Sequence, residues 1–423
     1  MRAVNASFSA AATPASPGRP AQSWTALLAL YGTVSFVEAI GISQVAAFLP
    51  LQLRGMGVPA TEIGQLVGLL TACQFLLGIP LVPVWGVLAD KYSRKAVIIR
   101  SALVEAVVLG ALALSVTPWQ VAVSLLLVGF QLGNSGVMLA ALRDVTPYGR
   151  LGTAVALYGA SQAVGLAVGP ALGGIMIDGF GLSLQAVFAL SCALSVAMAV
   201  LLVVASREVR PAVVPRGSLR VLAAEAIRGV FSDRNTRRLF AVLGLALLAR
   251  QMVSPFLPLL VIDIAGTGPG LASTVGFVVG AAALVGALVS PLSGALGDRV
   301  GFRPVLVAAL GGAAIVLLLM PLSPGVGLLA ALVACFAAFS AATSAMVFGL
   351  VSVETPSERR SATLNLVYTP LYVAGIIGPA VGAAAAGITL GAVFVAGAII
   401  TALAAAVVLA WARRRVAVTF LRR

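Results

Sequence analysis

The chain contains no histidine and only three cysteines, Cys73, Cys192 and Cys335. Without histidine, a Ser–His–Asp triad, a histidine-ligated metal and a histidine proton relay are all excluded. The cysteines lie far apart in sequence, each within an apolar run, so their spacing gives neither a disulfide framework nor a metal site. We interpret them as packing residues and predict no metal and no cofactor.

Charge is also scarce, at 9% of 423 residues, whereas 61% are hydrophobic and the mean hydropathy is +1.10. Apolar runs of 18 or more residues indicate transmembrane helices, and a chain of this length accommodates roughly a dozen of them. We therefore predict an all-α membrane protein whose partner is the lipid bilayer. In a soluble protein the net charge of +14 would suggest nucleic acid, but here we assign it to loops that set orientation and predict no nucleic-acid partner.

Twelve apolar segments divide the chain into two halves of six helices. The predicted spans are 24–50, 62–89, 95–116, 118–142, 151–177, 183–205, 238–262, 273–297, 304–322, 326–351, 361–386 and 390–412. The predicted regions are a disordered tail (1–23), an N-terminal half (24–205), a linker (206–237), a C-terminal half (238–412) and a basic tail (413–423).

The linker has apolar residues at helical spacing between Leu219 and Phe231, with basic residues interspersed. This pattern is typical of an amphipathic helix lying on the membrane surface. A basic linker that serves only topology remains equally open.

Basic residues fall on one side of the predicted topology. Of the 27 Lys and Arg residues, 24 lie in the two tails and in loops on the side of the termini, whereas the other side has only Arg54. The excess of Lys and Arg in cytoplasmic loops predicts that both termini and the linker are cytoplasmic.

A short charged segment, Gly86–Lys95, returns 208 positions later as Gly294–Arg303. The sequence Phe-Leu-Pro-Leu that ends the first span, starting at Phe48, recurs at Phe256 with the same offset. Gly-Pro-Ala-x-Gly follows at Gly169 and again at residue 378. Repeats in the same order indicate two pseudo-symmetric halves related by a parallel repeat.

The two charged segments resemble the loop signature of the major facilitator superfamily, in which a Gly and an Asp precede several basic residues. The matching residues, which we expect to form a cytoplasmic gate, are Gly86, Asp90, Arg94, Lys95, Gly294, Asp298, Arg299 and Arg303. Ser93 replaces the usual glycine and Phe302 a base. The resemblance covers the chain from the first span to the twelfth and implies a transporter, not an enzyme, that works by alternating access.

A glycine-rich motif in the fifth span is similar to that of bacterial drug:proton antiporters. It comprises Gly165, Gly169, Pro170, Gly173 and Gly174, and is echoed in the eleventh span by Gly378, Pro379 and Gly382. The resemblance implies a proton gradient as the driving force and a bendable contact between the halves. Ordinary packing of small residues is the alternative. The fourth span departs from the family because it lacks the usual Arg.

The resemblance also implies that Asp90 braces the start of the eleventh span, and Asp298 the start of the fifth. Asp90 ends the second span, where the helix dipole disfavours a carboxylate, so a compensating partner is expected. Arg94, Lys95 and a helix N-terminus of the other half are all candidates.

Four charged residues lie inside spans: Glu38, Arg100, Glu105 and Arg250. Each costs about 2.5–3.5 kcal/mol on insertion scales, so each should face protein or water. The repeat offset maps Arg250 to position 42, one helical turn from Glu38. We predict that the two face one cavity and that protonation of Glu38 loosens their pair and biases the transport cycle. A static pair is the alternative, and for Glu105 local pairing, including with Arg100, is as plausible as a proton role.

Polar residues elsewhere in the spans suit an amphiphilic organic substrate. The cavity candidates are Tyr31, Gln131, Asn134, Tyr158, Gln162, Asn365 and Tyr368. We predict a monomeric, multi-pass transporter of the bacterial inner membrane that exports drugs or similar small molecules. A carrier for a specific metabolite is the main alternative, and a membrane enzyme or sensor a remote one.

Overall fold

The computed structural model describes residues 23–210, 234–354 and 369–420, and every regular element within these ranges is helical. The N-terminal half contains α1 (Trp24–Gly55), α2 (Ala60–Leu76), α3 (Gly78–Lys91), α4 (Arg94–Leu114), α5 (Pro118–Gln131), α6 (Asn134–Val145), α7 (Leu151–Asp178) and α8 (Leu184–Ala205). The C-terminal half contains α10 (Arg234–Val253), α11 (Leu257–Ala265), α12 (Leu271–Val300), α13 (Phe302–Leu319), α14 (Val326–Glu354), α16 (Thr369–Ala386) and α17 (Leu390–Phe420).

Eleven helical segments of the described ranges are long and apolar enough to cross a membrane, and Pro370–Ala386 is a shorter apolar helix in the place of the eleventh span. The prediction of an all-helical membrane protein built from two six-helix halves is confirmed. The tail 1–22, linker residues 211–233 and the start of the eleventh span lie outside the described residues, so predictions made for them are untested.

Three spans predicted as continuous are interrupted. The second span divides at Leu77 into α2 and α3, and the fourth divides at Leu132 and Gly133 into α5 and α6. Gly133 has a φ of 91°, a conformation that costs glycine nothing but is strained for other residues. The seventh span divides at Ser254–Phe256, where Pro255 cannot donate a helical hydrogen bond.

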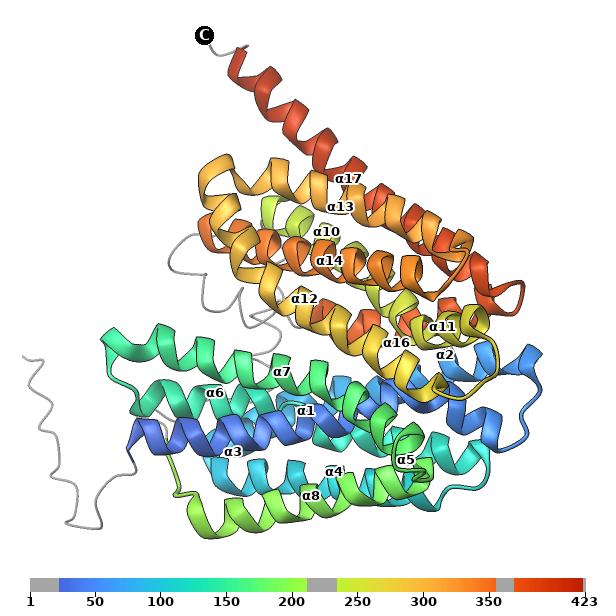
Figure 1. Cartoon of the computed structure of the whole chain (residues 1–423). Helices are drawn as coiled ribbons and strands as arrows, with labels where there is room; N and C mark the ends of the chain where they lie inside the picture. Colours follow the sequence, from blue (N-terminus) through green and yellow to red (C-terminus); the bar gives the residue numbers. More distant parts are fainter. Residues whose placement is uncertain (1–22, 211–233, 355–368, 421–423) are drawn as a thin grey trace, which may run out of the picture.

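The two halves lie side by side and meet unevenly (Figure 1). The end of the bundle where α1 begins and α17 ends is here called the terminal side, and the opposite end the far side. Figure 1 shows α7 and α12 in contact towards the far side and diverging towards the terminal side. Two helix pairs make the most extensive contacts between the halves, α7 with α12 and α2 with α16.

Glycines allow the helix backbones of the two halves to approach closely. In the first pair, Gly276 of α12 lies against the carbonyl oxygen of Pro170. In the second, Gly68 of α2 lies against the carbonyl oxygen of Pro379. Gly68 and Gly276 are separated by 208 positions, the offset of the sequence repeat. The two contacts are therefore symmetry-related copies, each pairing the second span of one half with the fifth of the other.

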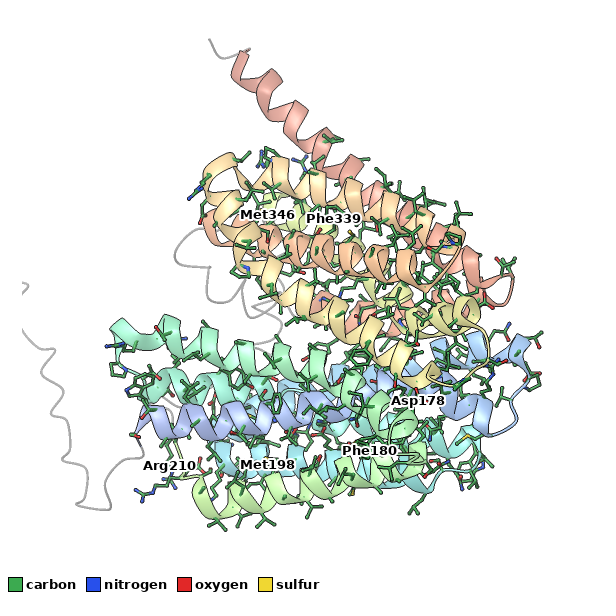
Figure 2. All side chains as sticks on the ribbon, viewed as in Figure 1. Asp178, Phe180, Met198, Arg210, Phe339 and Met346 are labelled. Atoms are coloured by element: carbon green, nitrogen blue, oxygen red, sulfur yellow. The ribbon has the colours of Figure 1, made fainter. Side chains whose placement is uncertain are left out.

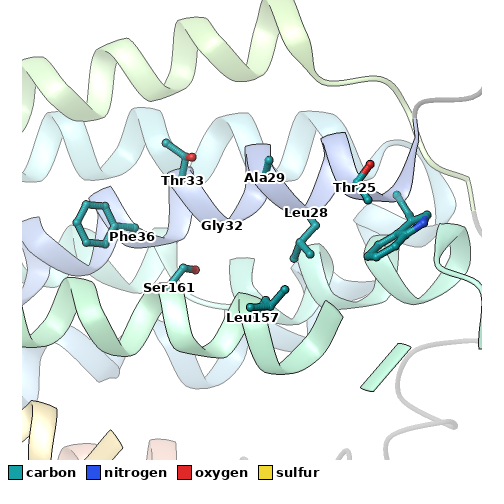
Figure 3. A pocket seen from close by; sticks show the side chains of 9 residues that line it. Thr25, Leu28, Ala29, Gly32, Thr33, Phe36, Leu157 and Ser161 are labelled. Atoms are coloured by element: carbon teal, nitrogen blue, oxygen red, sulfur yellow. The ribbon is translucent and has the colours of Figure 1, made fainter. Parts of the chain in front are cut away.

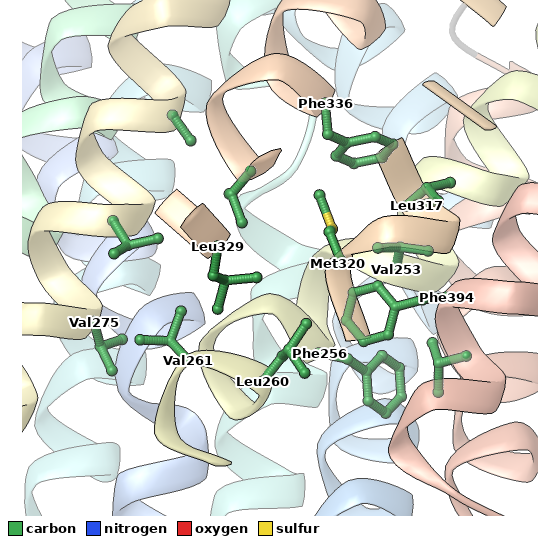
Figure 4. Packing of buried hydrophobic residues seen from close by; sticks show 14 of the residues in the cluster. Val253, Phe256, Leu260, Val261, Val275, Leu317, Met320, Leu329, Phe336 and Phe394 are labelled. Atoms are coloured by element: carbon green, nitrogen blue, oxygen red, sulfur yellow. The ribbon is translucent and has the colours of Figure 1, made fainter. Parts of the chain in front are cut away.

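Apolar clusters hold the helices of each half together, and one cluster on the far side is shared by both halves. On the far side of the C-terminal half, Phe256, Met320 and Phe394 are fully buried within one cluster (Figure 4). Phe48, the repeat partner of Phe256, is also fully buried in the same cluster. The repeated Phe-Leu-Pro-Leu segments therefore supply core residues where the halves are packed together.

Candidate functional site

A charged cluster lies inside the N-terminal half, where α1 faces the break between α5 and α6. The Asn134 amide, at the start of α6, donates hydrogen bonds to both carboxylate oxygens of Glu38, at 2.9 and 3.0 Å. Only 5% of the Asn134 side chain is exposed. The first turn of α6 also carries the positive end of a helix dipole, which favours a nearby carboxylate. The interruption of the fourth span thus places an amide donor and a helix N-terminus beside the Glu38 carboxylate.

Arg100 of α4 supplies the positive charge of this cluster. Its guanidinium lies 3.7 Å from the centroid of the Trp85 ring, and one of its nitrogens donates to the Gln131 carbonyl oxygen at 3.4 Å. Ser101 donates to the same oxygen at 2.9 Å. These contacts pair a carbonyl group that the end of α5 would otherwise leave unsatisfied. Arg100 is close enough to Glu38 for their charges to interact.

Glu105 is the second carboxyl group of the cluster. It lies one helical turn beyond Ser101 on α4, is 1% exposed, and packs against Gly41 of α1. Neither of its carboxyl oxygens has a hydrogen-bond partner among the described residues, and its charge interacts with that of Glu38. A glycine at position 41 leaves the space that the carboxyl group occupies.

This arrangement places two carboxyl groups and one guanidinium group in an apolar surrounding. If both carboxyl groups are ionised, one negative charge remains without a partner, and an unpaired buried charge is costly. If one carboxyl group holds a proton, the cluster is neutral. The geometry therefore suits a site that binds one proton, held by either Glu38 or Glu105.

The structure does not bring Glu38 and Arg250 together. Arg250 belongs to α10 and lines a separate cavity within the C-terminal half, with Phe336 and several hydroxyl-bearing residues. Glu38 instead meets Asn134 and Arg100 of its own half. The repeat offset correctly placed Glu38 and Arg250 on related spans but gave no information on which way either helix face is turned. Their pairing in another conformation stays a prediction.

A second cavity, of about 520 Å3, lies between α1 and α7. Figure 3 shows Leu157 and Ser161 of α7 beside Leu28 and Phe36 of α1. The remaining lining residues are Trp24, Thr25, Ala29, Gly32 and Thr33. The lining is apolar, with three hydroxyl groups and no charge, and its volume is in the range of small-molecule sites.

The residues predicted to line a substrate cavity have different environments. Tyr31 and Tyr158 are 1% and 2% exposed and belong to the core of the N-terminal half. Tyr158 accepts a hydrogen bond from Ser35 at 3.2 Å. Gln162 is half-buried and follows Ser161 of the α1–α7 cavity. Asn134 and Gln131 belong to the charged cluster, and Asn365 and Tyr368 lie outside the described residues.

The first copy of the predicted gate forms a network on the terminal side. Two nitrogens of Arg94 donate to the same oxygen of Asp90, at 2.9 and 3.0 Å, and a third nitrogen donates to Asp144 at 2.6 Å. Arg94 is buried and thus supplies the partner expected for Asp90 at the end of α3. The role of Asp144 at the end of α6 was not predicted.

Glu208 and Lys95 join the ends of α4 and α8. Glu208 accepts hydrogen bonds from the Ser93 hydroxyl and from the Arg94 backbone N–H at the start of α4. Lys95 donates to the carbonyl oxygens of Val203 and Ser206 at the end of α8, at 2.8 and 2.7 Å. A carboxylate at a helix N-terminus and an ammonium at a C-terminus both match the helix dipoles. All of these contacts stay within the N-terminal half and the first residues of the linker.

The second copy is more open. Asp298 is exposed, and among the described residues the structure records no hydrogen bond or ion pair at its carboxylate. Gly86 and Gly294 both have open space where a side chain would start, with no described atom of another residue within 4 Å of that position. Arg299 is exposed, and Arg303 lies in the first turn of α13. The bracing of one half by Asp90 and Asp298 of the other stays a prediction for a state in which the terminal side is closed.

The glycine groove of the fifth span was predicted to contact the other half, but it packs within its own half. Gly165, Gly169 and Gly173 of α7 all lie against α1 of the same half. Their counterparts Gly378 and Gly382 of α16 lie against α10. Positions four apart share one helix face, so the groove is occupied by α1, and the contact between halves uses the neighbouring face with Gly174 and the Pro170 carbonyl.

A carboxylate also joins the halves on the far side. Asp178, at the end of α7, accepts a hydrogen bond of 2.6 Å from the backbone N–H of Ser273 in the first turn of α12. Figure 2 shows Asp178 at the junction of the two halves. The loop motif predicted a carboxylate at a helix N-terminus of the other half, but on the terminal side. No motif marked Asp178.

Comparisons with known proteins give one consistent result. The family model of the Major Facilitator Superfamily matches residues 31–275 and 239–421. The chain is 29% identical to the Multidrug resistance protein MdtG of Enterobacter lignolyticus, over 71% of either chain. It is 26% identical to the Multi-drug resistance efflux pump PmrA homolog of Lactococcus lactis, over 83% of this chain and 86% of that one.

Solved transporters share the fold at low sequence identity. A bacterial homolog of the human lysosomal transporter Spinster, in an inward-facing and unoccupied conformation, has a TM-score of 0.74 and 14% identity, covering 92% of this chain and 97% of that one. The nucleoside transporter NupG has a TM-score of 0.75 and 15% identity, covering 91% and 99%.

Proposed function

Because the chain belongs to the Major Facilitator Superfamily, we propose that it exports amphiphilic small molecules from a bacterial cell in exchange for protons. It acts as a monomer in the inner membrane, needs no cofactor and binds no nucleic acid. Relatives named as multidrug resistance and efflux proteins support the direction and the substrate class. The uncharged, mainly apolar α1–α7 cavity supports an amphiphile over a sugar or a highly charged metabolite.

The observation that supports proton coupling is a pair of interacting carboxyl groups, half-buried Glu38 and fully buried Glu105, with the guanidinium of Arg100 near Glu38. Transfer of a proton to or from this cluster changes its net charge and therefore changes the attraction between α1, α4 and α6. Since α1 also lines the substrate cavity, a change in the attraction between α1 and its neighbours also alters the position of the cavity wall. Proton binding and cargo binding then bias the same equilibrium between two states.

In the predicted orientation the terminal side is cytoplasmic, so the present arrangement corresponds to an inward-facing state. Closing the terminal side would bring Asp90 and Asp298 towards the opposite halves. The Arg94 network keeps α3, α4, α6 and the start of the linker together, so the N-terminal half moves as a unit. Rocking of one rigid half against the other is the motion expected for this class of fold.

Dye export from inside-out vesicles energised by respiration tests the proposal. The wild-type protein should accumulate ethidium, and an uncoupler should abolish the accumulation. Glu38→Gln should insert normally but lose the response to the proton gradient, because its amide cannot ionise. Glu62→Gln, the same change at an exposed carboxyl group in the first turn of α2, serves as the control. Uncoupler-insensitive flux, or unchanged coupling in Glu38→Gln, would contradict the proposal.

A carrier for one specific metabolite is the second candidate, favoured by the polar network of Glu38, Asn134 and Arg100, which is more elaborate than a lipophilic cargo requires. Competition separates the two. An exporter of many amphiphiles should be inhibited by several structurally unrelated dyes, whereas a specific carrier should show no dye flux at all.

A further inference from the structure

Arg250 occupies an unusual position, inside a span of a half that has no carboxyl group within its spans. Of the four acidic residues between 238 and 412, Asp263, Asp298 and Glu354 lie in the last turns of α11, α12 and α14, and Glu358 lies outside the described residues. Among the described residues the structure records no hydrogen bond or ion pair at the Arg250 guanidinium. The nearest compensation is the last turn of α10, in which Arg250 lies, and a helix C-terminus supplies only about half a negative charge.

Arg250 is exposed and lines a cavity of about 20 Å3. One water-sized group requires roughly 10–15 Å3 by this measure, so the cavity holds one small group and not a whole cargo molecule. Its apolar walls include Leu243, Leu247 and Phe336. Apolar walls strengthen electrostatic attraction because they exclude water from around the charges.

Hydroxyl groups complete the lining of this cavity. Ser340, Thr343 and Ser344 of α14 follow Phe336 at spacings that keep them on one helix face. Ser344 donates to the Ser340 carbonyl oxygen at 3.0 Å, but within the described part of the chain the Ser340 and Thr343 hydroxyls have no recorded partner. Thr343 is 5% exposed. A cation with two free donors beside it, in an apolar cavity, is a set of groups complementary to an anion.

We propose that Arg250, Ser340 and Thr343 form a binding subsite for one monovalent anionic group. The group is either a free inorganic anion or the carboxylate of an acidic amphiphile whose remainder extends out of the small cavity. In the second case the subsite rests on the proposed function and extends it, since it assigns acidic amphiphiles to the cargo. The bound anion supplies Arg250 with the opposite charge that no described residue of the C-terminal half provides.

Thermal unfolding of the purified full-length protein in detergent tests the subsite without transport. Sodium benzoate, sodium chloride and neutral benzyl alcohol are titrated separately at an ionic strength held constant with sodium isethionate. A ligand that binds only the folded state raises the unfolding temperature as its occupancy rises. We expect benzoate, chloride or both to raise it, and benzyl alcohol to have no effect that depends on residue 250.

Substitutions locate the effect. Arg250→Gln should weaken anion binding by about 10- to 100-fold, the loss expected when one charge-assisted hydrogen bond is removed. Thr343→Val keeps the side-chain shape and should weaken anion binding less than Arg250→Gln does. Arg250→Lys keeps the positive charge and should retain part of the anion binding. Arg54→Gln, which removes an exposed positive charge at the end of α1, should bind as the wild type does. If Arg250→Gln fails to fold, Thr343→Val and Arg250→Lys still report on the site.

Each outcome has a definite meaning. Stabilisation by chloride but not benzoate identifies a free anion, and the reverse identifies a cargo carboxylate. Stabilisation by neither anion, or equal stabilisation of wild type, Arg250→Gln and Thr343→Val, overturns the subsite. Proton-driven dye export is measured on the same preparation after reconstitution. If dye export is absent but anions still bind, the proposed function is contradicted and the subsite is not. If dye export is present but no anion binds, the subsite is contradicted and the proposed function is not.

Discussion

Glu105 is a buried carboxyl group whose two oxygens have no hydrogen-bond partner among the described residues. An unsatisfied buried polar group costs about 1–3 kcal/mol of stability. Such a cost is commonly retained where the group has a function. Glu38, by contrast, has both oxygens paired with Asn134. The two carboxyl groups of the cluster are therefore not equivalent, and their substitution should have different consequences.

We predict that Glu105→Leu raises the unfolding temperature of the detergent-solubilised protein and weakens proton-coupled export. The stabilisation should be about 1–3 kcal/mol, because the unsatisfied group is removed and apolar atoms take its place beside Gly41. Thermal unfolding and vesicle efflux measure the two effects. Glu105→Gln is the matched control, since it removes the ionisable proton but leaves a buried polar group; it should weaken coupling without stabilising. A lower unfolding temperature together with full coupling in Glu105→Leu would refute the prediction.

The sequence identified which charged residues lie inside spans, because a charge in a long apolar run is evident from spacing alone. It did not identify their partners. Trp85 and Asn134 meet the cluster only because the second and fourth spans are interrupted, and Gly133 was the only local sign of the second interruption. Which faces of α1 and α4 meet depends on helix rotation, and spans this uniformly apolar carry almost no periodic signal for rotation.

At the scale of helices, the repeat was the most informative feature of the sequence. An offset of 208 positions pairs Gly68 with Gly276, and the structure places both against a proline carbonyl of the opposite half. The glycine motif of the fifth span was predicted to make the contact between halves, whereas its groove is filled by α1. Gly174 and the Pro170 carbonyl of the same motif do meet α12, whereas the three glycines at four-residue spacing define a groove without specifying its occupant.

Substitution of either symmetry-related glycine should destabilise the closed far side. In Gly276→Ala and Gly68→Ala the new methyl group meets the backbone carbonyl of Pro170 or Pro379, and a backbone cannot move aside as a side chain can. We expect each substitution to lower the export rate at least severalfold, with expression and folding retained. Initial rates of dye export in vesicles, normalised to protein amount, measure the effect.

Gly311→Ala is the matched control, because position 311 of α13 has open space around it and alanine is the better helix former. It should export at the wild-type rate. Because the two contacts are symmetry-related, Gly68→Ala in α2 and Gly276→Ala in α12 should lower the export rate by similar factors. Normal export in Gly276→Ala would show that the close approach of α7 and α12 is not needed for transport.

At the scale of the whole molecule, the close backbone contacts between the described parts of the two halves lie towards the far side. They include Gly174 against Ser273, Gly64 against Ala386, and the hydrogen bond from Ser273 to Asp178. On the terminal side the charged network of Arg94 stays within one half. If the protein works by the proposed alternating access, this structure is one of its two arrangements, and the far side separates during each cycle.

A disulfide across the far side tests this requirement directly. A Cβ placed on Gly64 of α2 lies 3.1 Å from the Cβ of Ala386 in α16, close to the roughly 3.5–4.5 Å between Cβ atoms that a disulfide needs. We predict that Gly64→Cys with Ala386→Cys, in a chain whose three native cysteines are replaced by serine, forms a disulfide on oxidation. Export should then stop, because the halves cannot separate, and return after reduction. Each single-cysteine variant, treated identically, controls for oxidation and for the substitutions themselves. Undiminished export by the cross-linked protein would mean that cargo leaves by a route that does not open the α2–α16 contact, and the rocking of rigid halves would have to be abandoned.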